Sequence, residues 1–82
     1  MDIKHLIMMA NDIGAYFAGY PSHDEAVDAI ANHLRNFWEA RMRRDIVAYV
    51  VGGGTDLKPI VREAVIAMNE AAPATTEDVG EG

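Results

Sequence analysis

Apolar residues recur at three- and four-residue steps in each segment of this chain that lies between its glycine and proline breaks. Because an α-helix repeats every 3.6 residues, this spacing places the apolar side chains on one helical face. No segment shows a convincing strict alternation of apolar and polar residues, which is the pattern of a half-buried strand. The pattern therefore predicts an all-α fold, a small bundle of three to four short helices.

The first helix is expected over residues 2–18. Asp2 places a negative charge at the helix N-terminus, where it is favourable. Gly19 and Pro21 end the helix, since proline disfavours helical geometry in the residue before it. The expected apolar face consists of Ile3, Leu6, Ile7, Ala10, Ile13 and Phe17.

The second helix begins near residue 23, because Ser22 and Glu25 have the spacing of a capping box. No strong helix breaker lies between residues 37 and 51, so either one helix covers 23–51 or a break near residues 38–41 separates two. We favour the break, which gives a third helix over residues 40–51. The expected apolar faces are Ala26, Val27, Ile30, Ala31, Leu34 and then Phe37 or Trp38 for the second helix, and Met42, Ile46, Tyr49 and Val50 for the third.

The three glycines at residues 52–54 stop the third helix, since glycine supplies the positive φ of a helix C-cap. Pro59 suits the first turn of a fourth helix over residues 58–71, with Val61, Ala64, Val65 and Met68 on its apolar face. From Pro73 the chain is acidic and nearly free of apolar side chains, so burial of apolar surface cannot offset the entropy lost when the segment is ordered. We therefore expect a helical domain over residues 1–72 and a flexible acidic tail over 73–82.

The chain has 82 residues, a formal net charge of −6 and no cysteine. Its length allows one domain, and without thiolates it offers no disulfide, Fe–S ligand or cysteine nucleophile. The acidic balance argues against nucleic-acid binding, which needs clustered cations. No apolar run approaches the roughly 20 residues that span a bilayer, and the N-terminus lacks the pattern of a secretory signal. We expect a cytoplasmic protein that binds neither nucleic acid nor membrane.

The polar residues offer little for catalysis. Ser22 is explained by its helix cap, and the glycine run lacks the following Lys-Ser or Lys-Thr of a phosphate-binding loop. The histidines do not have the spacing of a helical metal pair, and each is expected to be a surface or packing residue: His5, His23 and His33. We therefore expect no catalytic, cofactor-binding or metal-binding residue, and no enzymatic activity of the chain itself.

Positive charge and aromatic side chains are concentrated in residues 35–44. Arginine and tryptophan are typical anchors of protein interfaces. One interpretation is a solvated basic face, with Phe37 and Trp38 turned inward and the arginines paired to Glu39 and Asp45. We favour instead a surface that docks on an acidic protein partner, with these residues as candidates: Arg35, Phe37, Trp38, Arg41, Met42, Arg43 and Arg44.

Three sequence blocks resemble the delta subunit of NAD-dependent formate dehydrogenase. Together they cover residues 1–68, and their order and spacing make the resemblance specific. The chain departs from the family pattern at Ala40, where proline is expected. The matching residues are Leu6, Met9, Ala10, Asn11, Ile13, Gly14, Tyr16 and Phe17 in the first block, His33, Leu34, Phe37, Trp38, Arg41, Met42 and Arg43 in the second, and Gly53, Gly54, Leu57 and Pro59 in the third.

The resemblance implies a non-catalytic accessory subunit that stabilises or assembles a cytoplasmic enzyme complex. In that class of enzyme the alpha subunit, which the resemblance implies as the docking partner, holds a molybdenum or tungsten bis-pterin guanine dinucleotide and Fe–S clusters. Beta and gamma subunits hold FMN and further clusters, and NAD accepts the electrons of formate. An alternative implied role is that of a transient maturation factor for molybdenum-cofactor insertion. The chain itself is expected to bind none of these cofactors.

Overall fold

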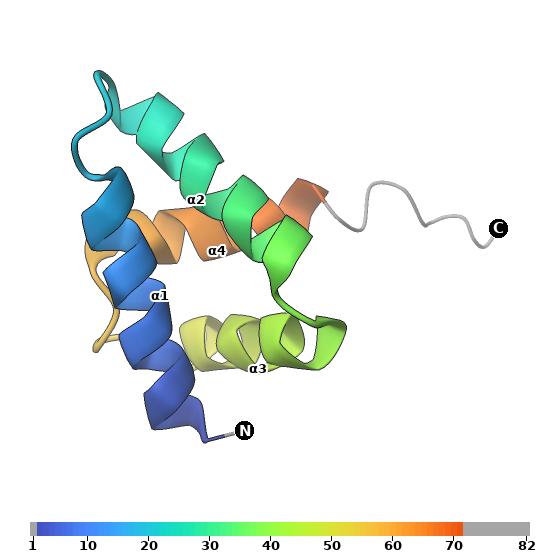
Figure 1. Cartoon of the computed structure of the whole chain (residues 1–82). Coiled ribbons are helices and arrows are strands. Elements are labelled where there is room, and N and C mark those ends of the chain that lie inside the picture. The colour runs from blue at the N-terminus through green and yellow to red at the C-terminus, as the bar shows by residue number, and fades with distance from the viewer. Residues whose placement is uncertain (1, 72–82) are drawn as a thin grey trace, which may run out of the picture.

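A computed structural model describes residues 2–71 of the chain. These residues form four α-helices and no strand, which confirms the predicted all-α bundle (Figure 1). The expected flexible tail, residues 73–82, lies outside the described residues. The helices are α1 (Ile3–Phe17), α2 (His23–Phe37), α3 (Ala40–Val51) and α4 (Pro59–Ala71).

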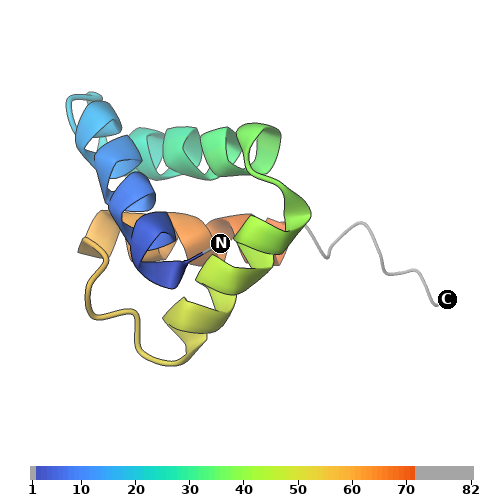
Figure 2. The same ribbon diagram turned by 60° about the horizontal axis from the view of Figure 1, so that its bottom comes forward.

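Helix α4 is the centre of the packing, because its contacts with the other three helices are the most extensive, above all those with α2. Figure 1 shows α4 passing behind α2, with α1 and α3 at two sides of it, and Figure 2 shows α3 crossing α4. All four apolar residues expected on the α4 face are buried. The core cluster consists of Leu6, Ala10, Val27, Ile30, Ala31, Leu34, Trp38, Ile46, Leu57, Val61, Ala64, Val65 and Met68.

The predicted helix ends are supported by specific hydrogen bonds. The Ser22 hydroxyl accepts from the backbone N–H of Glu25 at 3.1 Å, and the Asp2 carboxylate accepts from the N–H of Lys4 at 3.3 Å. At the end of α3, Gly54 has φ of 62° and donates its N–H to the carbonyl of Tyr49. A β-carbon is disfavoured in that left-handed conformation, which explains a glycine at this turn.

The chain breaks between α2 and α3, as favoured from the sequence, and does not run as one long helix. Trp38 and Glu39 are both extended, with ψ of 141° and 157°. The guanidinium Nη1 of Arg43 donates to the backbone carbonyls of Arg35 and Trp38. A cation at these carbonyls satisfies the C-terminal end of α2 and complements its dipole. Arg43 thus stabilises the break, although no proline is present at residue 40.

Replacing Ala40 with proline should stabilise the fold by about 0.4–1 kcal/mol. Ala40 is the first residue of α3, where the N–H has no intrahelical acceptor. Glu39 already has the extended conformation that proline favours in the residue before it. Proline at residue 40 therefore restricts the unfolded chain and removes no helix hydrogen bond. Chemical denaturation should show a higher midpoint for the variant, and a lower midpoint would mean that the ring clashes.

Two residues of α1 fix the loop before α4 and the packing of α4 itself. The side-chain amide of Asn11 donates to the carbonyl of Asp56 at 3.0 Å and accepts from the N–H of Lys58 at 2.9 Å. Gly14 is buried, and a β-carbon there would clash with Cγ2 of Val61. Both residues therefore serve the internal packing of the bundle.

A single ion pair within residues 2–71 links the start of α2 to α4. Nε2 of His23 lies 2.9 Å from each carboxylate oxygen of Glu63. The hydrogen bond to Glu63 and the charge of that carboxylate raise the pKa of His23 above its ordinary value, and Asp24 adds to the effect. Sequence reasoning expected a solvated His23 but did not find this partner.

This pair should make stability depend on pH. The pKa of His23 is raised in the folded state, so its protonation favours folding. The pair's contribution to the free energy of unfolding is therefore complete below the unfolded-state pKa of about 6.5. It is lost as the pH rises through the folded-state pKa. The free energy of unfolding should therefore differ more between the natural chain and Glu63→Gln at about pH 6 than at about pH 8.5. An equal difference at both pH values would show that the charged pair contributes nothing.

Candidate docking surfaces

The structure divides the expected docking segment between two hollows on either side of the α2–α3 break. Phe37, Trp38 and Met42 line an apolar hollow shared with α1. Arg35 and two arginines of α3 line a second hollow, which is shared with α4. Adjacent residues of one sequence cluster therefore belong to two surfaces of different chemistry.

The first surface is an apolar groove between α1 and the end of α2. One part has a volume of about 500 Å³ and is lined by Asp12, Ile13, Tyr16, Phe17, His33 and Phe37. An adjoining part of about 400 Å³ shares four of these residues and adds Met9, Trp38 and Met42. We call these nine residues the apolar groove.

Aromatic side chains dominate the rim of the apolar groove. Tyr16 is 79% exposed and Phe37 is 73% exposed. Neighbouring rings hold both side chains. Tyr16 packs edge-on to Phe17 with ring centroids 5.0 Å apart, and the ring centroids of Phe37 and His33 are 4.7 Å apart. Large aromatic side chains in this setting present rigid apolar area to a partner at low entropic cost.

Trp38 differs from its neighbour Phe37, because it is only 5% exposed and belongs to the core. The interpretation that turned both aromatic residues inward therefore holds for Trp38 and is wrong for Phe37. Trp38 is one of the docking residues predicted from the sequence. In the structure it supports the groove from beneath and offers a partner little surface.

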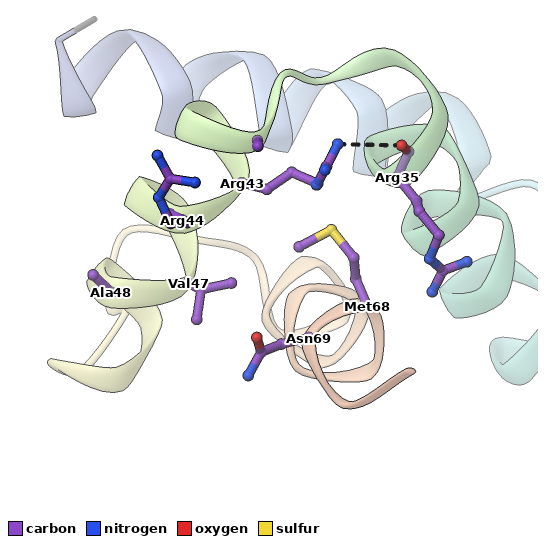
Figure 3. Close-up of a pocket in the computed structure, with 8 residues that line it drawn as sticks. Arg35, Arg43, Arg44, Val47, Ala48, Met68 and Asn69 are labelled. Carbon is purple, nitrogen blue, oxygen red and sulfur yellow. Dashed lines mark hydrogen bonds between the residues drawn. The ribbon is translucent and has the colours of Figure 1, made fainter. Parts of the chain in front are cut away.

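The second surface is a basic pocket of about 340 Å³ between α2, α3 and α4 (Figure 3). Figure 3 shows Arg43 reaching from α3 to the backbone oxygen of Arg35. Nη1 of Arg35 donates to Oδ1 of Asn32 at 2.6 Å. The basic pocket is lined by Arg35, Ala40, Arg43, Arg44, Val47, Ala48, Met68 and Asn69.

Within the part of the chain that the structure describes, the arginines of the basic pocket have no carboxylate partner. The ion pair found there joins His23 and Glu63 and includes no arginine. The pairs with Glu39 and Asp45, which belonged to the alternative interpretation of a solvated basic face, are therefore absent among residues 2–71. Arg41 is exposed and lines neither hollow. The seven candidate residues thus comprise three in the apolar groove, three in the basic pocket and one outside both.

Sequence reasoning missed the α1 half of the apolar groove and the α4 wall of the basic pocket. Tyr16 carried a usable signal, because it is a large aromatic residue that lies off the apolar face of its own helix. Met68 and Asn69 carried none, since their place beside the arginines depends on how α4 crosses α3.

Within residues 2–71, no group of three or more metal-ligating side chains comes together. None of the helices described there is long and apolar enough to cross a bilayer.

Comparison with known families identifies the chain. A family model described as NADH-dependant formate dehydrogenase delta subunit FdsD matches residues 5–65, which is more than half of the sequence. The chain belongs to this delta-subunit family. The match confirms the resemblance noted from the three sequence blocks, and both surfaces include residues within the matched range. No curated protein and no solved structure matched this delta-subunit chain.

Proposed function

We propose that this chain is a non-catalytic accessory subunit that stabilises or assembles a cytoplasmic, molybdenum- or tungsten-containing, NAD-dependent formate dehydrogenase. In this proposal other subunits oxidise formate to carbon dioxide and reduce NAD. The observation that carries the proposal is the exposed apolar groove in a chain of the delta-subunit family. Exposed apolar surface rimmed by polar groups is typical of a protein–protein interface.

The proposed partner is the alpha subunit, which would cover the apolar groove. Docking would add the aromatic area of Tyr16 and Phe37 to a shared core and remove it from water. A partner that binds only the folded chain also stabilises it by mass action. This is how a small bundle with a limited core would gain stability inside a larger complex.

The cofactors implied for such an enzyme do not fit the donor groups of this chain. It has no cysteine to ligate an Fe–S cluster. Residues 2–71 contain no strand, and so none of the βαβ units of a dinucleotide-binding fold. We therefore assign the pterin cofactor, the Fe–S clusters, FMN and NAD to the alpha, beta and gamma subunits of the proposed complex.

Native mass spectrometry of the complex purified through an affinity tag on this chain tests the proposal. An accessory subunit should be present at one copy for each alpha subunit of the mature, cofactor-loaded enzyme. A transient maturation factor would instead accompany only the cofactor-free alpha subunit. Absence of every formate dehydrogenase subunit from the purified material would contradict both roles.

A further inference from the structure

The basic pocket concentrates positive charge in a chain whose formal net charge is −6. Three arginines line it, and within residues 2–71 none of them forms an ion pair. Acidic residues outnumber basic ones in the sequence by 13 to 7. The local composition is therefore opposite in sign to that of the whole chain, which favours an anionic occupant of this pocket.

The three arginines have different tasks. Arg43 is held by the carbonyls at the end of α2, so its position is fixed by the fold. Arg44 is exposed and makes no side-chain hydrogen bond within the described residues. Arg35 uses one nitrogen for Asn32 and keeps further donors. Arg35 and Arg44 are therefore the side chains that are free to bind an external carboxylate.

The rest of the pocket indicates which kind of anion fits. Val47, Ala48 and Met68 supply an apolar wall beside the guanidinium groups. A glutamate side chain has an aliphatic stem for such a wall and a carboxylate that arginine can bind with two parallel hydrogen bonds. A free phosphate ion has no apolar part, so the wall would contribute nothing to its binding.

We propose that the basic pocket binds a glutamate-bearing acidic segment of a partner protein, with Arg35 and Arg44 as the carboxylate-binding residues. The identity of that partner as a formate dehydrogenase subunit rests on the proposed function, but the chemistry of the pocket does not. The pocket and the apolar groove flank the same α2–α3 break. One partner could therefore engage the chain by charge on one side and by apolar contact on the other.

Titration of the full chain with an acetylated oligoglutamate peptide, followed by amide NMR signals, tests the pocket directly. The signals of Arg35, Ala40, Arg44 and Val47 should shift together and saturate. Oligoglutamine, which has the same length of stem and no charge, should not shift them. Inorganic phosphate at matched ionic strength should bind more weakly than oligoglutamate.

Charge-removing variants make the assignment specific. The double change Arg35→Gln and Arg44→Gln should weaken oligoglutamate binding by about tenfold or more, because each removes charge-assisted hydrogen bonds. Arg41→Gln is the matched control, since Arg41 is an exposed arginine of α3 outside the pocket, and it should change binding by less than about twofold. Arg43 is left unchanged because it caps α2.

The proposal is overturned if oligoglutamate shifts no pocket signals, or if the double variant and Arg41→Gln bind it equally. Equal binding of phosphate would identify a general anion site and would also overturn it. Glu77 and Asp78 belong to the acidic segment 73–82. If their signals shift when the double variant is made, before any peptide is added, this chain's own acidic residues occupy the pocket and the proposal is also overturned. Failure of the chain to copurify with formate dehydrogenase would contradict only the proposed function, since the titration uses no other subunit.

Discussion

Replacing Trp38 with alanine should destabilise the isolated chain by about 3–5 kcal/mol. Trp38 is 5% exposed and lies in the core cluster where the chain passes from α2 to α3. Truncation would remove a large apolar side chain and leave a cavity at the point where these helices meet the core. A loss of this size approaches the whole stability of a small domain. Chemical denaturation followed by circular dichroism should show a largely unfolded variant.

Phe37→Ala is the control for this prediction, because the neighbouring aromatic residue is 73% exposed. Its removal should change the free energy of unfolding by no more than about 0.5 kcal/mol. Cooperative unfolding of Trp38→Ala at the midpoint of the natural chain would contradict the buried position of Trp38. The contrast also shows that Trp38 is unsuitable for testing docking, since its loss would abolish binding through unfolding.

Replacing Tyr16 and Phe37 together with alanine should lower the affinity for the formate dehydrogenase alpha subunit by at least about tenfold. These two side chains form the exposed aromatic rim of the apolar groove. Aromatic residues that become desolvated at an interface carry much of its binding free energy. The amount of alpha subunit recovered per tagged chain, measured at equal chain concentration, should fall accordingly, while the fold of the variant remains intact.

Met8→Ala and Val51→Ala are the matched controls for the groove. Met8 is 55% exposed and Val51 is 82% exposed, and neither lines the apolar groove or the basic pocket. Both remove exposed apolar area without touching the groove, so recovery of the alpha subunit should stay near that of the natural chain. A similar loss in all these variants would mean that exposed apolar area in general, and not the groove, governs association.

The helices could be predicted from the sequence because their signals are local. The apolar period, the Ser22 cap and the glycine turn each depend on residues a few positions apart, and the structure places all three as expected. The α2–α3 break was harder to predict, since Ala40 replaces the expected proline. Its stabilising contacts join Arg43 to carbonyls five and eight residues earlier.

The orientation of the two central aromatic residues could not be predicted, because both lie at the end of the α2 apolar face. Trp38 leaves the helix with extended geometry, and Trp38, not Phe37, is buried in the core. Helical periodicity does not apply beyond that point. The roles of Asn11 and Gly14 could not be predicted either, because their contacts are with residues 56, 58 and 61, which are distant in sequence.

The concentration of arginine and aromatic residues in residues 35–44 is visible in the sequence, but its division between two surfaces depends on tertiary packing. Helix α1 supplies one wall of the apolar groove and α4 supplies one wall of the basic pocket. Neither helix adjoins residues 35–44 in sequence. Only the crossing of the helices brings Tyr16 toward Phe37 and Met68 toward Arg43.

Hydroxyl-radical footprinting of the isolated chain and of the native formate dehydrogenase complex tests most directly whether the apolar groove is the docking surface. Tyr16 and Phe37 should be oxidised in the isolated chain and protected in the complex, as read by peptide mass spectrometry. Met8 serves as the internal reference, since it is exposed outside the groove and should be oxidised equally in both. Equal oxidation of Tyr16 and Phe37 in the two states would contradict the account.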